Sequence, residues 1–141
     1  MARLETTERS ERRWAVEGYE HIDAARLETF PYEYPGSEAV VEVSTDEFTA
    51  VCPWSGLPDF GRLTIRYVPR DRVLELKAYK YYVHSYRNVG IYQEHAANRV
   101  LQDLVRVVEP AWMELELDYN VRGGVRTTVR VRWPQGDGAS G

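Results

Sequence analysis

Apolar and polar residues alternate along part of the chain with the two-residue period of β-strands. The first predicted strand, 39–52, is mostly apolar on one side and has an irregularity near Asp46 of the kind that a β-bulge produces. The segment 53–61 contains two prolines and two glycines and is expected to be a loop. In the next strand, 62–67, apolar residues alternate with arginine and threonine, so the two strands should form a long hairpin.

The middle of the chain follows the helical period instead. A short helix is predicted over 75–87, because the stop signal Asn88-Val89-Gly90 follows it. A second helix ends before Pro110, since proline cannot continue a helix. Its apolar stripe recurs every three or four residues and consists of Ala97, Val100, Leu101, Leu104, Val105 and Val108.

Two further strands carry charges of opposite sign. Apolar residues alternate with acids over 113–119 and mainly with arginines over 125–131. A three-residue loop at 122–124 would pair Val121 with Val125 and set the acids opposite the arginines. The pairs predicted by this register are Glu114 with Arg132 and Glu116 with Arg130.

The order strand, strand, helix, helix, strand, strand predicts an α+β fold, a four-stranded antiparallel sheet with two helices on one face. The outer strands of such a sheet have unpaired backbone groups, which proteins cover or pair with another subunit. We therefore expect an oligomer. Subunits joined edge to edge could close a barrel, with sites where two chains meet.

The 141 residues, 43% of them apolar, suit one domain whose core needs no disulfide or structural metal. We place this domain at 37–133. The segment 1–36 is rich in Glu, Arg and Thr, and the prolines of its last part, 30–36, interrupt regular structure, so we expect an arm rather than a core element. The tail 134–141, mostly Gly, Ser and Asp, is expected to be mobile.

Composition also limits the compartment and the partners. A single cysteine forbids an internal disulfide, the charged first residues do not resemble a signal peptide, and no run reaches the roughly 18 apolar residues of a membrane span. We therefore expect a cytoplasmic protein without a membrane partner. The net charge of -4 and the pI near 5.4 argue against direct binding to nucleic acid.

Lysine occupies only two of the 18 basic positions, Lys77 and Lys80. In a helix the two side chains share one face, whereas in a strand their odd spacing would point them to opposite sides. Two interpretations stay open. The pair either lies by chance on a solvated face or forms a site that needs compact ammonium groups.

Candidate chemistry gathers in the loop of the first hairpin. Cys52 opens this loop and Asp59 lies near its far end, so a nucleophile and an acid could face one pocket. The alternative is a small buried thiol and an aspartate that caps a turn. His21, His84 and His95 lie in the arm and in or near the helices, with nothing in the sequence to orient them toward the cysteine.

Two kinds of site are disfavoured. One cysteine and three scattered histidines give no CxxC, HxH or HExxH spacing, so no metal site is predicted. No GxGxxG turn links a strand to a helix, so a dinucleotide cannot be bound in the Rossmann manner and would have to be held by isolated cations.

Four segments carry a specific resemblance to a known family. They are FTAVCPWSGLPDFG at 48–61, ELKAYKYY at 75–82, Gln-Glu at 93–94 and Arg-Gly-Gly at 122–124. In this order and spacing they resemble the NADPH-dependent nitrile reductases of the queuosine pathway, which convert 7-cyano-7-deazaguanine to 7-aminomethyl-7-deazaguanine. The likeness spans about 39–133. It implies the tunnelling fold, in which homo-oligomers form barrels, here expected as two stacked rings.

The resemblance also implies roles for individual residues. Cys52 matches the nucleophile that forms a covalent thioimide with the nitrile carbon, and Asp59 matches the proton donor. The positions implied for substrate binding are Leu74, Glu75, Leu76, Gln93 and Glu94, of which Glu94 reads the guanine-like edge of the base. The positions implied for NADPH binding are Lys77, Lys80, Arg122 and Gly123.

The chain departs from this family at two positions. Leu76 stands where serine is common and offers only its backbone groups. Gln93 stands where histidine is common and cannot become cationic. Two alternatives to nitrile reduction remain: a purine- or pterin-binding oligomer without redox chemistry, in which Cys52 only packs, and the zinc-dependent cyclohydrolases of the same fold, which the missing metal ligands make improbable.

Overall fold

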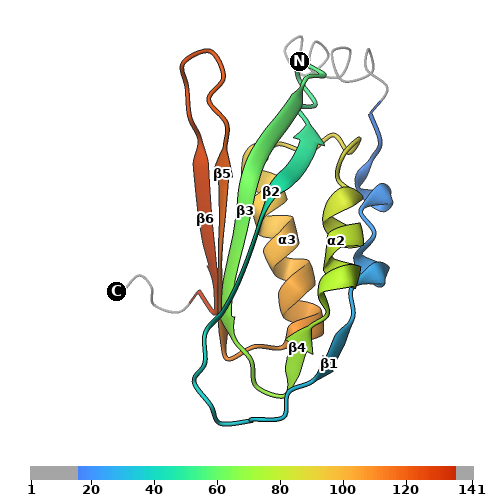
Figure 1. The fold of residues 1–141 in the computed structure, drawn as a ribbon. Coiled ribbons are helices and arrows are strands. Elements are labelled where there is room, and N and C mark those ends of the chain that lie inside the picture. Colours follow the sequence, from blue (N-terminus) through green and yellow to red (C-terminus); the bar gives the residue numbers. More distant parts are fainter. Residues whose placement is uncertain (1–15, 136–141) are drawn as a thin grey trace.

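The computed structural model describes residues 16–135, so the predicted arm and tail lie partly outside the described residues. Short elements precede the main sheet (Figure 1). In chain order the elements are η1 (Tyr19–His21), η2 (Ala24–Arg26), β1 (Thr29–Pro31), β2 (Val41–Val51), β3 (Pro58–Val68), β4 (Arg72–Leu74), α2 (Leu76–His84), α3 (Gln93–Val108), β5 (Trp112–Tyr119) and β6 (Thr128–Trp133).

Four strands form an antiparallel sheet in the order β2-β3-β5-β6, and α2 and α3 cover one of its faces (Figure 1). The predicted α+β class and the order of the six main elements are confirmed. A second sheet pairs β1 with β4 near the start of α2. None of the described helices is long and apolar enough to cross a bilayer.

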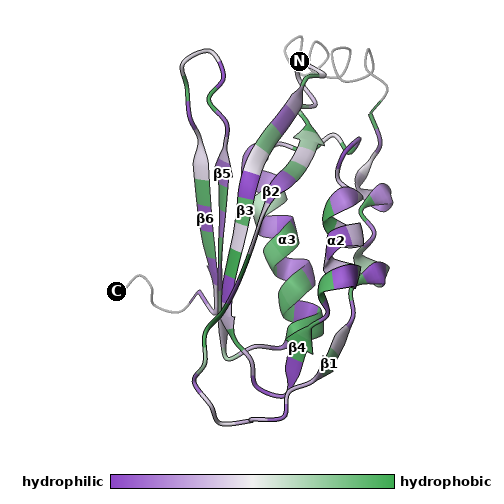
Figure 2. Ribbon diagram, viewed as in Figure 1, coloured by the Kyte–Doolittle hydropathy of each residue, from purple (hydrophilic) through white to green (hydrophobic). Residues whose placement is uncertain are grey.

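The core lies between the sheet and the helices, because alternation points every second strand residue toward them. Figure 2 shows the apolar bands that recur along α3, which confirm the predicted stripe. Among the side chains with 2% exposure or less are Leu63, Ile65 and Tyr67 of β3, Val100, Leu104 and Val108 of α3, and Leu115 and Leu117 of β5.

The predicted irregularity in the first strand is confirmed. The register of β2 against β3 shifts between Thr45 and Phe48. The extra residue restores the inward direction of Phe48, which is fully buried beside Tyr86 and Tyr119. The bulge thereby fixes which side chains face inward over the last part of β2, where Cys52 follows.

The expectation that the segment before residue 37 takes no part in the core is wrong for its described part. Ile22 and Leu27, on either side of η2, are 5% and 7% exposed and belong to the same apolar cluster as the helices and sheet. β1 also pairs with β4, with Phe30 opposite Val73, despite the proline at the end of β1. Turns this short have no periodicity from which burial can be inferred.

The hairpin between β5 and β6 has the predicted register but a different turn. Glu116 lies opposite Arg130 as expected. The predicted three-residue loop with Val121 paired to Val125 is wrong. Arg122 and Val125 exchange two backbone hydrogen bonds of 2.9 Å around a two-residue Gly-Gly turn with φ of 59° and 79°. Two glycines adopt this backbone without strain. The segment that links β5 to the turn is consequently one residue longer than the segment that links the turn to β6.

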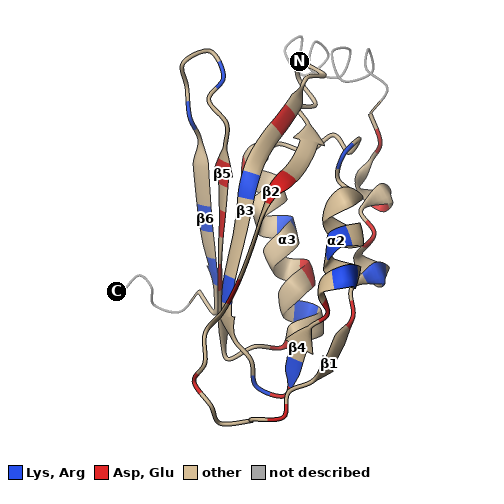
Figure 3. Cartoon of the chain, in the orientation of Figure 1, with Lys and Arg blue, Asp and Glu red and all other residues tan. Residues whose placement is uncertain are grey.

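Charged residues recur along all four strands of the main sheet (Figure 3). Those that form ion pairs on the face away from the helices have one sign on each strand. Acids on β2 and β5 alternate with arginines on β3 and on or beside β6. The ion pairs are Arg62–Asp46 (3.0 Å), Arg66–Glu42 (2.7 Å), Arg126–Asp118 (3.0 Å), Arg130–Glu116 (3.0 Å) and Arg132–Glu114 (2.8 Å). The two outer strands therefore carry opposite charges, acidic on β2 and basic on β6.

Candidate active site

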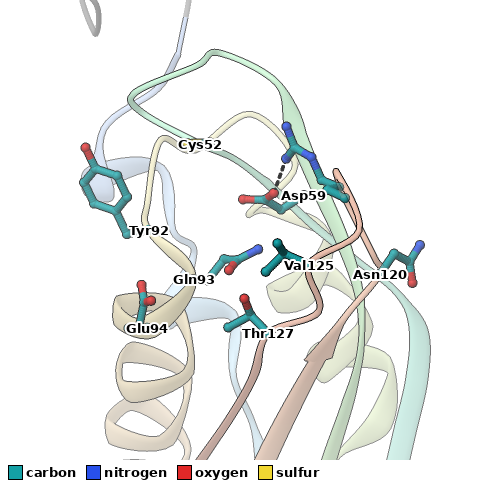
Figure 4. A pocket seen from close by; sticks show the side chains of 9 residues that line it. Cys52, Asp59, Tyr92, Gln93, Glu94, Asn120, Val125 and Thr127 are labelled. Carbon is teal, nitrogen blue, oxygen red and sulfur yellow. Dashed lines mark hydrogen bonds and ion pairs between the residues drawn. The ribbon is translucent and has the colours of Figure 1, made fainter. Parts of the chain in front are cut away.

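A pocket of about 410 Å³ opens where β2 ends and β3 and α3 begin (Figure 4). Its lining comes from three separate stretches of the chain. It consists of Cys52, Asp59, Tyr92, Gln93, Glu94, Asn120, Arg122, Val125 and Thr127. The structure thus brings together five of the predicted site residues: Cys52, Asp59, Gln93, Glu94 and Arg122.

Cys52 is held by a compact loop. Its N–H donates to the carbonyl of Leu57 (2.9 Å), and its own carbonyl accepts from the N–H of Gly56 (2.8 Å). The thiol is unpaired and the residue is partly exposed. These two bonds fix the backbone of Cys52 at the edge of the pocket, which the residue lines, so it is not sealed in the core.

Asp59 lies in β3, because the loop is shorter than predicted. β3 begins at Pro58, opposite Val51, and Asp59 is opposite Ala50. Proline is tolerated as the first residue of a strand, where its missing N–H is not required. The Asp59 side chain is 7% exposed and accepts a hydrogen bond from the guanidinium of Arg122 (Figure 4). A buried carboxylate thus faces the same pocket as the thiol.

The start of α3 is fastened to the end of β2. The N–H of Val51 donates to the carbonyl of Val89 (2.9 Å), and the N–H of Ile91 donates to the carbonyl of Val51 (3.0 Å). These bonds place Gln93 and Glu94, the first two residues of α3, beside the loop of Cys52. The N-terminal end of a helix also favours a carboxylate such as that of Glu94.

Tyr119, at the end of β5, connects the sheet to the start of α3. Its hydroxyl donates to the carbonyl of Gln93 (3.3 Å), which ties α3 to β5. Burial raises the pKa of Tyr119 above its ordinary value, and the carboxylates of Asp59 and Glu94 raise it further. The hydroxyl therefore stays protonated and acts as a hydrogen-bond donor.

Sequence reasoning missed several residues of the pocket. Asn120 and Thr127 are polar residues on either side of the Gly-Gly turn, and this position beside a tight turn is the signal that could have identified them. Val125 follows the turn directly. Tyr92 immediately precedes α3, but no pattern separates its lining role from a position that only starts a helix.

The predicted substrate-binding residues 74–76 lie elsewhere, at the end of the subunit where α2 begins (Figure 1). Leu74 is a core residue, 2% exposed, whose N–H donates to the hydroxyl of Tyr67 (3.0 Å). The Glu75 carboxylate caps α2 by accepting from the N–H groups of Ala78 (2.7 Å) and Lys77 (3.1 Å). These two hydrogen bonds lower the pKa of Glu75.

The predicted helical placement of the two lysines is confirmed. Lys77 and Lys80 are exposed on α2 (Figure 3), three residues apart and therefore on one face. Neither lines the pocket of Cys52 within the same subunit. Gly123, the fourth predicted cofactor position, lies in the exposed hairpin turn next to Arg122.

Within residues 16–135 no three His, Cys, Asp or Glu side chains come together as a metal site. The chemistry that the pocket offers on its own is that of a thiol, two carboxylates and a guanidinium. A thiol and a carboxyl group that line one pocket suit nucleophilic addition to an electrophilic carbon followed by proton transfer.

The chain is similar to one group of known proteins. The model of the family described as QueF-like protein matches residues 58–137, which is 80 of the 141 residues. A protein of Caldicellulosiruptor bescii named NADPH-dependent 7-cyano-7-deazaguanine reductase is 54% identical over 123 residues, 87% of this chain and 94% of its own. One of the same name from Caldanaerobacter subterraneus subsp. tengcongensis is 52% identical over 128 residues, 91% of this chain and 96% of its own.

A solved structure has the same fold. The crystal structure of the archaeosine synthase QueF-Like in the apo form superposes with a TM-score of 0.63 at 28% identity, covering 68% of this chain and 94% of that one. This likeness is consistent with the tunnelling fold. The family model covers more than half of the chain and the relatives share half of their residues with it over most of its length, so the chain belongs to the QueF-like family.

Proposed function

We propose that this protein uses NADPH to reduce the nitrile of 7-cyano-7-deazaguanine to the amine of 7-aminomethyl-7-deazaguanine, a step in the synthesis of queuosine. The names of its relatives support this reaction. The observation that carries it is that Cys52, Asp59 and Glu94, expected as nucleophile, acid and base reader, line one pocket. All three fall within 37–133, which we take as the catalytic domain.

The first step is nucleophilic addition by Cys52. The S–C bond forms while one π bond of the nitrile breaks, and its electron pair goes to nitrogen, which takes a proton from the carboxyl group of Asp59. The product is a covalent thioimide. Sulfur suits this step, because a thiolate is a strong nucleophile and can leave again once the carbon is reduced.

Glu94 is proposed to recognise the base. A carboxylate accepts hydrogen bonds from a ring N–H and an exocyclic amine at once, which matches the guanine-like edge of the substrate. Glu94 is exposed at the first turn of α3, on the wall of the pocket. Gln93, beside it, can donate and accept hydrogen bonds but carries no charge, so it cannot replace Asp59 as the proton donor.

Two molecules of NADPH, bound one after the other, would each supply one hydride. The residues present fit such a dinucleotide, whose phosphates need cations. Arg122 offers a half-exposed guanidinium at the pocket, and Lys77 and Lys80 offer two ammonium groups on one face of α2. Gly123, without a side chain in the turn, leaves space beside Arg122.

The site is completed by a neighbouring copy of the chain in this proposal. Residues 74–80 lie at the opposite end of the subunit from Cys52, so one chain cannot supply all the assigned contacts. The acidic outer strand β2 and the basic outer strand β6 are complementary, which favours pairing β2 of one copy with β6 of the next and disfavours like pairs. Repeating this contact closes a barrel, and two such rings are expected to stack.

Intact mass spectrometry tests the function. Protein mixed with 7-cyano-7-deazaguanine should gain the full mass of the substrate, because addition expels nothing, and Cys52→Ala should not. The same mixture should oxidise NADPH. A wild-type protein that binds the compound, stays unmodified and consumes no NADPH would instead be a passive purine binder.

A further inference from the structure

The ion pair between Asp59 and Arg122 joins two residues that the proposed function uses for different tasks. Asp59 gives protons to the substrate nitrogen, while Arg122 holds a phosphate of NADPH. In the structure Arg122 Nη1 donates to Asp59 Oδ1 and, at 3.3 Å, to the carbonyl of Pro58. The ion pair therefore engages Nη1 of Arg122 and Oδ1 of Asp59 with each other.

Asp59 cannot act as an acid while this pair is intact. A guanidinium keeps its protons in proteins, so the hydrogen between the two groups belongs to Arg122. Of the nine residues that line the pocket, Arg122 alone is basic, and the other ionisable residues there besides Asp59, namely Cys52, Tyr92 and Glu94, carry either no charge or a negative one. Arg122 is therefore the group that balances the buried carboxylate.

The hairpin leaves Arg122 access to a second partner. Its backbone is anchored up to Asn120, whose N–H donates to the carbonyl of Phe60 (2.8 Å). Beyond that point the turn stands open, since a Cβ built on Gly123 or Gly124 would meet nothing within 4 Å. The Arg122 side chain is 39% exposed, and among the described residues only its Nη1 donates. Its Nε and Nη2 are the atoms that a phosphate reaches first, and the open turn lets the guanidinium then swing from Asp59 to that phosphate without movement of the strands.

We propose, on the basis of the proposed function, that Arg122 is exchanged between Asp59 and a phosphate of NADPH. When the phosphate binds the guanidinium, the Asp59 carboxylate loses its partner, takes a proton from water and can give that proton to the substrate nitrogen. Before the cofactor arrives, the acid is engaged and the adduct forms more slowly. Because such coupling is reciprocal, Asp59 also competes with the cofactor for Arg122.

The competition predicts a result that a simple loss of a catalytic group does not. In Asp59→Asn the guanidinium is released, so NADP⁺ should bind more tightly than to the wild type, by roughly three- to tenfold, as measured by titration calorimetry on the full chain. Arg122→Gln should weaken NADP⁺ binding. In the Arg122→Gln background, Asp59→Asn should no longer improve it, since there is no guanidinium to release.

A matched variant separates this exchange from the general field of the pocket. Glu94→Gln removes another carboxylate from the same wall, one without a hydrogen bond to Arg122, and should leave the NADP⁺ affinity nearly unchanged. Equal tightening in both variants, or none in Asp59→Asn, overturns the exchange. A wild type that does not bind NADP⁺ at all contradicts the cofactor of the proposed function itself.

A second measurement covers the case in which Asp59→Asn does not fold. NADP⁺ carries no hydride, yet it should speed formation of the Cys52 adduct in the wild type by releasing Asp59, and it should have no such effect in Arg122→Gln. An adduct rate in the wild type that is indifferent to saturating NADP⁺ would overturn the proposal.

Discussion

The two ends of the subunit use their charged residues in different ways. At the pocket end Asp59 and Glu94 converge on a cavity and face a thiol. At the α2 end the Glu75 carboxylate accepts hydrogen bonds from two backbone N–H groups, and the neighbouring lysines are exposed to solvent. In the proposed function, the pocket end supplies the reacting groups and the α2 end supplies further binding groups. Contact between two copies of the chain is proposed to bring the two ends together.

The largest effect is expected from mixing two inactive variants. Cys52→Ala damages the pocket end, and Lys77→Glu with Lys80→Glu damages the α2 end, so each protein alone should show no NADPH oxidation above background. If each site takes one end from each of two chains, subunits exchanged at equal ratio should restore about a quarter of the wild-type rate.

Remixing under conditions that prevent subunit exchange is the control for this experiment. Activity that stays at background after verified exchange would mean that both ends serve the same chain, and the difference between the two ends would then lose its functional meaning.

Single variants should separate chemistry from binding at the two ends. Asp59→Asn removes the proton donor and should lower kcat by about 10² to 10⁴, because general acid catalysis has this size. Lys80→Ala should instead raise the KM for NADPH about tenfold and leave the mass adduct at Cys52 intact. Steady-state kinetics and intact mass measure both.

Asp46→Asn is the matched control for the acid, since Asp46 is 76% exposed in the bulge of β2 and its partner, Arg62, is likewise on the surface. It should leave kcat unchanged. Loss of the adduct in Lys80→Ala would assign this lysine to the substrate and not to the cofactor.

The regular elements of the fold were predictable from the sequence, whereas its turns were not. Three features were predictable: the stripe of α3, the bulge before Phe48 and the pairing of Glu116 with Arg130. Each of these elements packs one face against the core, and this contact sets the spacing of its apolar residues. The turn at residues 123–124 and the burial of Ile22 were not, since a turn has no period and alternative loop lengths differ little in energy.

The site was predictable only in part for a similar reason. Cys52 and Asp59 lie in one short segment, so their proximity follows from the chain alone. Tyr119 reads as a core residue of an alternating strand, and nothing local shows that its hydroxyl reaches Gln93. The distance between 74–76 and the pocket cannot be read from the sequence, because it depends on how the elements pack and on how copies of the chain assemble.

Two glutamates, one at each end of the subunit, should affect different properties when each is replaced by glutamine. Glu94→Gln should raise the KM for the nitrile substrate about 10- to 100-fold and leave the unfolding midpoint near that of the wild type. Glu75→Gln should lower the midpoint in urea at neutral pH, because the cap of α2 is weakened.

The pH dependence identifies the cap as the cause. The pKa of Glu75 is lower in the folded chain than its ordinary value in the unfolded chain. Its stabilisation is therefore present above the ordinary pKa and is lost as the pH falls through the folded pKa. The difference in urea midpoint between wild type and Glu75→Gln should therefore shrink from pH 7 to pH 3. A constant difference would assign the effect to packing.

The smallest effect concerns the charged strands that are proposed to bring the two ends together. Glu42→Lys with Asp46→Lys makes the outer strand β2 basic, like β6, and should weaken assembly by about 1 kcal/mol per contact at low salt, as for exposed charge pairs. Mass photometry at micromolar concentration should show smaller oligomers, and added salt should reverse the loss because it screens like charges.

Both substitutions also break ion pairs inside the subunit, so the control must do the same away from the edge. Glu114→Lys with Glu116→Lys breaks two such pairs on the inner strand β5 and leaves the charges of β2 and β6 as they are. If β2 meets β6 of the next copy, only the outer-strand variant loses the large oligomer. Equal loss in both variants would mean that the charge pattern stabilises the subunit and does not select its neighbour, and the union of the two ends would then have to arise through another surface.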